Sequence, residues 1–194
     1  LGFGEDDFVF ACISRIDPQK GQHLLVEALG KLAGSGRAAK LLLAGPVTDP
    51  QYRAELEATI ARLGLGGQVR LLDPVTPESE RHAGLLAASD AFVLPSRHEP
   101  FGIVVLEAWA AGRPVITSDV GGLQRLIDPG ADGLVFESGA VEGLSEQMAA
   151  LMGDATRAGE LASAGRAIVL AEYTWEKVAD DLEQIYRRAE QDRA

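Results

Sequence analysis

A short apolar segment of the sequence carries carboxylates at a spacing that suits an anionic ligand with hydroxyl groups on both sides. Residues 101–112 are all apolar or glycine except Glu107, and Glu99 lies just before them. This composition predicts a helix that begins near Gly102, where free backbone N–H groups can bind an anion without a side chain in the way. Glu107 then lies about 7 Å further along the helix axis. A diphosphate at the helix start would have one carboxylate on each side, as the diphosphate of a nucleotide sugar has a ribose and a hexose.

The surroundings of Glu107 allow two interpretations. A helix that is apolar all round is buried on most sides, and an ionised carboxylate there is costly unless another group compensates it. Glu107 could accept hydrogen bonds from the hydroxyl groups of a ligand, or it could cap a neighbouring loop or pair with a cation. The spacing from Glu99 and Gly102 favours the first interpretation.

Two cations follow the first expected strand. Arg15 and Lys20 lie in the segment 14–21, which reads SRIDPQKG. Arginine can bind phosphate oxygens through two parallel hydrogen bonds, and lysine adds a point charge. The alternative is a solvated turn in which Asp17 neutralises one of the cations. Phosphate binding is favoured because the strands that precede Arg15 and Gly102 are both expected at the centre of a sheet.

Two further loops could bring backbone groups to a ligand. Gly121 and Gly122 follow the fifth expected strand, where paired glycines let the backbone approach a ligand closely, although a glycine pair is also an ordinary turn. Backbone around Val75, after the third expected strand, could meet the edge of a base or form a simple loop. His23 and His82 occur in helical patterns and are expected on the surface.

Six short apolar runs alternate with longer helical patterns. The runs are rich in branched residues and nearly continuous, which is typical of strands buried on both faces of a parallel sheet. They cover residues 8–13, 40–44, 69–72, 91–94, 114–117 and 133–136. Helices are expected at 22–33, 50–63, 79–88, 103–111, 123–127, 141–152, 156–170 and 175–190. This order predicts an α/β fold of the doubly wound, Rossmann-like class, with a mostly parallel sheet of about six strands and additional helices at the C-terminal end.

Length, composition and charge narrow the class of protein. The 194 residues suffice for one substantial core, and 46% hydrophobic with 24% charged residues is ordinary for a globular domain. No run approaches the roughly 20 apolar residues of a membrane-spanning helix. The formal net charge of -11 disfavours broad binding to nucleic acid or to an anionic membrane, although a few local cations can still bind a small anion. Cys12 is the only cysteine, so no internal disulfide can form and a reducing compartment fits.

Several common motifs do not occur in the sequence. It has no cysteine and histidine cluster with zinc spacing, no Gly-x-x-x-x-Gly-Lys-Ser/Thr phosphate loop, and no Gly-x-Gly-x-x-Gly at the start of the first helix. The latter two absences disfavour a kinase-type NTPase and a dinucleotide oxidoreductase.

In combination the motifs resemble the C-terminal, donor-binding domain of retaining glycosyltransferases of the GT-B fold, in the large group called family 4 or group 1. The resemblance extends over nearly the whole chain, from residue 8 to the last helix. It rests on four motifs: Arg15-x4-Lys20, Glu99-Pro-Phe-Gly continuing to Glu107 as Glu-x7-Glu, Gly112-x-Pro114-Val115, and Gly121-Gly122.

The resemblance implies roles for the charged residues. Arg15 and Lys20 would stabilise the departing nucleoside diphosphate, Glu99 would position hydroxyl groups of the donor sugar, and Glu107 would bind the ribose. Fixed cations and a helix N-terminus would oppose the negative charge that develops on the leaving phosphate. Such enzymes typically need no metal ion, and no Asp-x-Asp motif occurs here, so neither a metal nor a cofactor is expected.

Backbone groups complete the donor site that the resemblance implies. Phosphate and sugar would be held by the backbone between residues 101 and 104, and further contacts would come from the two glycines and the third loop. The donor-binding residues expected in this way are Phe101, Gly102, Ile103, Val104, Gly121, Gly122 and Val75.

The resemblance also implies the organisation of the whole enzyme. Residues 1–194 would form the nucleotide-sugar-binding half of a longer chain whose N-terminal, acceptor-binding domain is absent from this sequence. With that domain the enzyme would transfer a hexosyl group to an acceptor hydroxyl with retention of anomeric configuration, and the fragment by itself would be inactive. The last helix would cross to the other domain and expose an apolar stripe of Val178, Leu182 and Ile185. The expected location is the cytoplasm, free or at the inner membrane surface through the missing domain.

Two residues depart from the family pattern. Arg125 stands where a glutamate commonly follows the glycine pair, and Asp73 replaces a glycine at the start of the third loop. Both affect the identity of the donor more than the class of reaction. Two alternatives remain open, a nucleotide-sugar-binding module without catalysis and another GT-B enzyme such as an epimerase or a phosphorylase.

Overall fold

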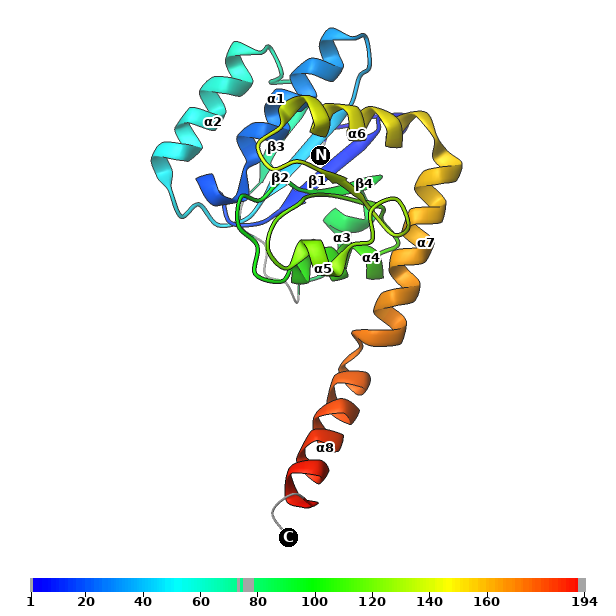
Figure 1. Ribbon diagram of the computed structural model, residues 1–194. Coiled ribbons are helices and arrows are strands. Elements are labelled where there is room, and N and C mark those ends of the chain that lie inside the picture. The colour runs from blue at the N-terminus through cyan, green and yellow to red at the C-terminus, as the bar shows by residue number, and fades with distance from the viewer. Residues whose placement is uncertain (1, 73, 75–78, 192–194) are drawn as a thin grey trace.

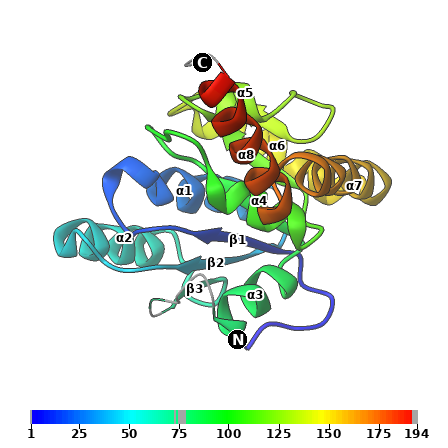
Figure 2. The same ribbon diagram turned by 90° about the horizontal axis from the view of Figure 1, so that it is seen from below.

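A parallel β-sheet forms the centre of the molecule, and helices cover both of its faces (Figure 1 and Figure 2). The computed structural model describes residues 2–72, 74 and 79–191. Within these residues the sheet has six strands in the order β3-β2-β1-β4-β5-β6, and every neighbouring pair is parallel. The strands are β1 (Val9–Ile13), β2 (Lys40–Ala44), β3 (Val69–Leu72), β4 (Ala91–Leu94), β5 (Val115–Ser118) and β6 (Leu134–Phe136).

The winding of the chain reverses between β1 and β4. The chain moves outward from β1 to β3, returns to β4 beside β1, and then moves outward in the other direction. Phe10 lies opposite Ala91, and Ala11 lies opposite Phe92, so the carboxyl ends of both strands reach the same edge of the sheet. The predicted doubly wound α/β class is therefore confirmed, and in such sheets a ligand binds at this reversal point.

Local signals set the boundaries of the helices. Asp49, Ser79 and Asp154 cap α2, α3 and α7, and each side chain accepts a hydrogen bond from the backbone N–H three residues further on. The helices are α1 (Gln22–Gly34), α2 (Pro50–Arg62), α3 (Glu80–Ala87), α4 (Ile103–Ala110), α5 (Leu123–Leu126), α6 (Val141–Gly153), α7 (Ala155–Glu172), α8 (Trp175–Gln191) and the short 3-10 helix η1 (Pro18–Lys20). Strands and helices begin and end within two residues of their predicted positions.

Alternate residues of each central strand face two separate hydrophobic clusters. On one face, Phe10 and Cys12 of β1 pack with residues from α1, α2 and α6. On the other face, Ala11 and Ile13 of the same strand pack with residues from α3, α4 and α5. Because both faces are covered, the strands are apolar at nearly every position, which explains the continuous runs in the sequence.

Helix α4 is less buried than its sequence predicts. Val105, Ala108 and Trp109 are buried, and Gly165 of α7 lies so close to Trp109 that an added Cβ would meet the indole ring. Ile103, in contrast, is 65% exposed. The expectation that this helix is buried on most sides is wrong, because only one of its faces packs against the sheet and α7.

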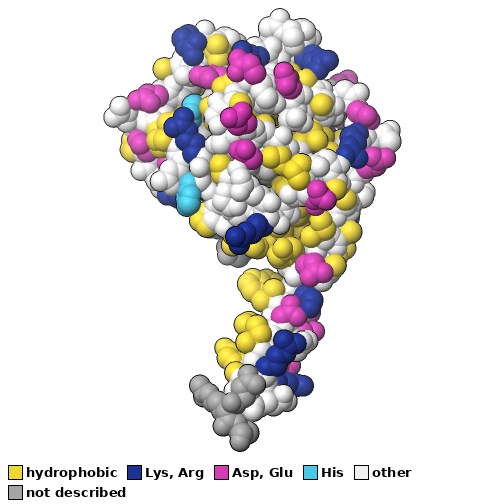
Figure 3. Space-filling view, in the orientation of Figure 1, with side chains coloured by type: hydrophobic (Ala, Val, Ile, Leu, Met, Phe, Trp, Pro, Cys, Tyr) yellow, Lys and Arg dark blue, Asp and Glu magenta, His cyan; other side chains and the backbone are white. Residues whose placement is uncertain are grey.

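The C-terminal helix α8 extends away from the rest of the molecule (Figure 1). No residue of α8, all of which the structure describes, is buried. Its apolar side chains gather on one face (Figure 3), and they confirm and extend the predicted stripe: Trp175, Val178, Leu182, Ile185 and Tyr186. Among the described residues, no helix combines the length and the apolar character that crossing a membrane requires.

Candidate functional site

The loops that follow β1 and β4 meet at the reversal point of the sheet. The backbone N–H of Arg97 donates to the carbonyl oxygen of Gln19 at 2.7 Å, which ties the two loops together. Gly21 has a φ of 69° and lies so close to Pro95 that an added Cβ would collide with its carbonyl oxygen. This close approach brings the side chains of both loops into one site.

Lys20 and Glu99 form an ion pair between these loops. Lys20 Nζ lies 2.7 Å from Glu99 Oε2, and the two side chains are only 15% and 12% exposed. A pair with so little exposure is screened weakly by water, so each charge depends on the other. The structure thus joins two of the predicted catalytic residues, although the sequence did not predict this pairing.

Asp17 shapes the loop after β1 and pairs with its arginine. Its side chain accepts a hydrogen bond from Gln19 N at 2.9 Å at the start of η1, and Arg15 Nη1 lies 3.2 Å from Asp17 Oδ2. The side chain of Arg15 is 51% exposed, whereas that of Asp17 is 10% exposed. Asp17 therefore pairs with Arg15, as the alternative interpretation of this loop predicted. Lys20 instead pairs with Glu99 in the other loop.

Helix α4 begins at the edge of this site, as predicted. Gly102 is its N-cap, with a φ of 100°, and an added Cβ would lie 2.7 Å from Leu123 Cδ2. Glycine is thus required both by the backbone conformation and by the contact with α5. The N–H groups of Ile103 and Val104, in the first turn, have no acceptor within the helix. They can bind an anion placed at the start of α4.

The glycine pair packs against the loop that carries Glu99. Gly122 N donates to the carbonyl oxygen of Glu99 at 2.8 Å. Added Cβ atoms on Gly121 and Gly122 would meet the carbonyl oxygens of Glu99 and Pro100. The two glycines therefore permit a close contact between two loops, which holds Glu99 in position.

An apolar cavity lies on one side of the start of α4. Its volume is about 560 Å³, within the range of small-molecule sites. Glu107, with a side chain that is 30% exposed, lines it, as does Arg15 from the first loop. The lining residues are Ile13, Ser14, Arg15, Gly45, Pro46, Pro74, His82, Ile103, Val104 and Glu107. Arg15, Ile103, Val104 and Glu107 were predicted in the site; Val75, also predicted there, lies outside the described residues.

His82 was expected on the surface, and this expectation is wrong. It is 6% exposed, and its Nε2 lies 3.1 Å from Glu107 Oε2. Leu85 and Leu86, on the same helix α3, are also buried. The spacing of three and four residues places His82 on the apolar face of the helix, and this pattern was the signal that could have revealed its burial.

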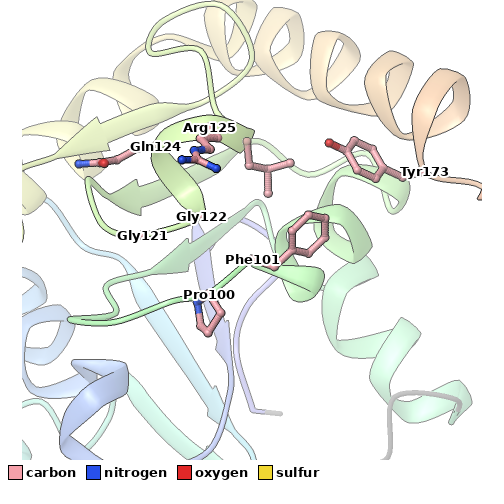
Figure 4. Close-up of a pocket in the computed structure, with 8 residues that line it drawn as sticks. Pro100, Phe101, Gly121, Gly122, Gln124, Arg125 and Tyr173 are labelled. Carbon is pink, nitrogen blue, oxygen red and sulfur yellow. The ribbon is translucent and has the colours of Figure 1, made fainter.

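A second cavity lies beside the glycine pair (Figure 4). Its volume is about 490 Å³, and it is lined by Pro100, Phe101, Gly121, Gly122, Gln124, Arg125, Leu126 and Tyr173. The rings of Phe101 and Tyr173 lie 6.0 Å apart in an edge-on arrangement. Arg125 thus lines a cavity that adjoins the glycine pair and the loop of Glu99.

Burial shifts the pKa of groups beneath the site. It raises the pKa of the Cys12 thiol to about 11 and that of Tyr52 to about 12. Burial, with a smaller contribution from the nearby Arg97, lowers the pKa of His23, whose Nδ1 lies 2.9 Å from Tyr52 Oη. Desolvation favours the neutral form of all three groups. Among the described residues, no group of three His, Cys, Asp or Glu side chains is placed to hold a metal ion.

The fold and this geometry define a class of protein. A doubly wound sheet with a helix start and a cationic loop at its reversal point is the architecture of a nucleotide-binding domain. Residues 1–168 match the family described as glycosyl transferases group 1, so the chain belongs to this family.

Several known proteins are similar to the chain over most of its length. A GDP-mannose-dependent monoacylated alpha-(1-6)-phosphatidylinositol monomannoside mannosyltransferase from Corynebacterium glutamicum is 36% identical over 95% of the chain and 48% of that protein. A D-inositol 3-phosphate glycosyltransferase from Rhodococcus erythropolis is 34% identical over 97% of the chain and 43% of that protein. The chain thus spans about half the length of the curated relatives that it matches.

Solved structures share the fold. Sucrose-phosphate synthase from Thermosynechococcus elongatus superimposes with a TM-score of 0.86 and 31% identity, over 98% of the chain and 47% of that structure. Alr3699/HepE from Anabaena, solved in complex with UDP and glucose, gives a TM-score of 0.86 and 28% identity, over 94% of the chain and 48% of that structure.

Proposed function

We propose that this chain binds the nucleoside diphosphate sugar donor of a glycosyltransferase. One observation carries the proposal: the ion pair of Lys20 and Glu99 lies beside the open N-terminus of α4, next to an apolar cavity that Glu107 lines. Cations, free N–H groups and a carboxylate in this order suit a diphosphate followed by a ribose.

The donor would extend across the start of α4. The nucleoside enters the apolar cavity, where Glu107 accepts hydrogen bonds from the ribose hydroxyl groups. The diphosphate lies against the N–H groups of Ile103 and Val104, and the sugar lies near Glu99. The proposed contacts of Phe101, Gly102, Gly121 and Gly122 are with phosphate and sugar, either directly or through the loop that holds Glu99.

Lys20 and Arg15 would act on the leaving group. As the bond between the anomeric carbon and the phosphate oxygen breaks, negative charge develops on the diphosphate. Fixed positive groups that already point at that position stabilise the transition state more than the ground state. Lys20 is held by Glu99 before the donor binds, so its charge is in place without reorganisation.

The complete enzyme would transfer a hexosyl group to an acceptor hydroxyl with retention of anomeric configuration and without a metal ion. We propose that an N-terminal domain supplies the acceptor site, which the roughly twofold length of the relatives supports. The Corynebacterium relative is named as GDP-mannose-dependent, and the Anabaena protein was solved with UDP-glucose. GDP-mannose and UDP-glucose are therefore candidate donors. The proposed location is the reducing cytoplasm.

The test uses the full-length protein that contains this chain. Calorimetry with UDP, GDP and ADP, and transfer assays with UDP-glucose and GDP-mannose, should show binding of at least one nucleotide and turnover of its sugar. Glu107→Ala and Lys20→Met should weaken binding, whereas Lys31→Met, on a surface pair with Glu142, serves as the matched control. The proposal fails if none of UDP, GDP and ADP binds at millimolar concentration. Binding without transfer or sugar release would instead favour a module without catalysis.

A further inference from the structure

We propose that His82 is a positioning residue that orients the Glu107 carboxylate for the ribose of the donor. The inference rests on the proposed function, because it gives Glu107 the ribose as its ligand. Among the described residues, His82 provides the one hydrogen bond that the structure gives the Glu107 side chain, with 3.1 Å between Nε2 and Oε2. Both residues line the apolar cavity beside α4.

The chemistry of the contact fixes the direction of the hydrogen bond. An ionised carboxylate only accepts hydrogen bonds, so the imidazole nitrogen that meets it has to carry the hydrogen. His82 Nε2 therefore donates to Glu107. His82 Nδ1 is buried and has no hydrogen-bond partner among the described residues, so no second contact competes for the orientation of the ring.

Apart from His82, the described neighbours of Glu107 do not orient its carboxylate. The residues next to Glu107 on α4 are apolar, and its side chain is 30% exposed, so without a donor it would sample several rotamers. Arg15 lines the same cavity, but its guanidinium is 3.2 Å from Asp17. A carboxylate that is already oriented loses less conformational freedom when it binds a ligand.

The burial of His82 adds rigidity to the contact. Its side chain is 8% exposed, and it lies on the face of α3 that also buries Leu85 and Leu86. The imidazole is thus fixed by the packing of a helix, and it holds one oxygen of Glu107 through a hydrogen bond. Oε1 and the remaining lone pair of Oε2 stay available for two hydroxyl groups. His82 would in this way favour nucleotides whose pentose carries the hydroxyl groups to which Glu107 hydrogen-bonds.

A cycle of ligand and protein changes tests this inference on the full-length protein. Affinities for UDP and GDP are measured beside those for their 2′,3′-dideoxy analogues, in the wild type, in His82→Leu and in His82→Gln. Leucine removes the donor but fills the apolar position, and glutamine keeps an N–H group at a similar reach. Leu85→Val loosens the packing of α3 while keeping both His82 and Glu107, so it is the matched structural control.

The expected pattern separates the two proposals. The wild type should bind the ribonucleotide more tightly than the dideoxy analogue, and His82→Leu should lose about tenfold of the ribonucleotide affinity alone. His82→Gln should recover most of that loss, and Leu85→Val should affect both ligands alike. If His82→Leu changes neither ligand or weakens both equally, the positioning role is overturned. If the wild type itself does not distinguish the two ligands, the ribose assignment of Glu107 fails instead.

Discussion

Glu99 and Glu107 lie eight positions apart in one segment, yet the structure gives them different partners. Glu99 pairs with the charged Lys20 across two loops, and both side chains are nearly enclosed, at 12% and 15% exposure. Glu107 pairs with the imidazole of His82 across two helices, and its own side chain is 30% exposed. The first pair joins the carboxyl ends of β1 and β4, and the second lines an apolar cavity.

We expect these two pairs to have different tasks within one site. A weakly screened ion pair places a positive charge where a phosphate can share it, and removing either partner leaves the other uncompensated. A carboxylate held by a histidine keeps free acceptor positions toward the cavity, which suits hydroxyl groups. The region of Lys20 should therefore govern charge and turnover, and the region of Glu107 should govern recognition of the nucleoside.

Lys20→Met should have the largest effect. In the proposed function it removes a positive charge near the leaving phosphate, so kcat of the full-length enzyme should fall about 10²–10³-fold. Steady-state transfer kinetics measure this loss. Lys31→Met, in a pair with side chains 48% and 72% exposed, should leave kcat unchanged. A kcat of Lys20→Met within about threefold of the wild type would contradict the assignment of charge stabilisation to Lys20.

Arg15→Ala should have a smaller effect on the same kinetics. The side chain is 51% exposed and already pairs with Asp17, so water and a carboxylate weaken its field at the phosphate. We expect kcat to fall about 10- to 100-fold. Arg15→Lys keeps the charge but loses the planar fork, and its kcat should lie between those of the wild type and Arg15→Ala. A loss as large as that of Lys20→Met would contradict this ranking.

The effect of Glu107→Ala on affinity should depend on whether the ligand contains a ribose. Affinity for UDP or GDP should fall about tenfold, because the ribose loses its carboxylate. Affinity for inorganic pyrophosphate should not change, whereas Lys20→Met should weaken both ligands. Calorimetry on the full-length protein measures all of these constants. Equal losses for pyrophosphate and nucleotide in Glu107→Ala would place this carboxylate at the phosphate instead of the ribose.

Cys12→Ala should have the smallest effect at neutral pH. Cys12 lies in β1, the strand that precedes the loop of Arg15 and Lys20, so the substitution tests how tightly this strand is packed. Burial raises the pKa of its thiol from 9.0 to about 11. The folded pKa lies above the unfolded one, so this contribution to stability is complete below about pH 9 and is lost as the pH rises toward 11. The total loss is on the order of 3 kcal/mol.

Urea unfolding of the wild type and of Cys12→Ala measures this effect. The stability difference between the two proteins should be constant up to about pH 9 and should then shift in favour of Cys12→Ala. Burial, the largest cause of the raised pKa of Tyr52, is present in both proteins and cancels in the difference, whereas the smaller contribution from the charge of Cys12 is lost in Cys12→Ala. If the difference in unfolding free energy stays the same up to pH 11, the packing of β1 does not shield the thiol from water.

Local patterns in the sequence predicted most of the fold and the chemical groups of the site. Continuous apolar runs such as 40–44 and 69–72 predicted buried parallel strands, and the structure has β2 and β3 at those residues. Gly102 was predicted at the start of a helix, and it is the N-cap of α4. These predictions succeed because secondary structure and capping depend on residues only a few positions apart.

The predictions that failed concern the surroundings of side chains. His82 was expected on the surface and is buried against Glu107, and residues 101–112 were expected to be buried on most sides although Ile103 is exposed. The glycine pair also packs against the loop of Glu99, a contact that the sequence did not predict, and its contact with a ligand stays a prediction. Each outcome depends on which elements pack against each other, which local patterns do not specify.

The sequence by itself determined the order of strands and helices, the doubly wound class and the positions of Arg15, Lys20, Glu99 and Glu107 after strands or at the start of a helix. Only the tertiary structure decided the partners: Lys20 meets Glu99 across 79 positions of the chain, and His82 meets Glu107 across 25. The reason is physical. Backbone hydrogen bonding and apolar periodicity act over neighbouring residues, whereas pairing across loops and helices follows from the winding of the whole sheet.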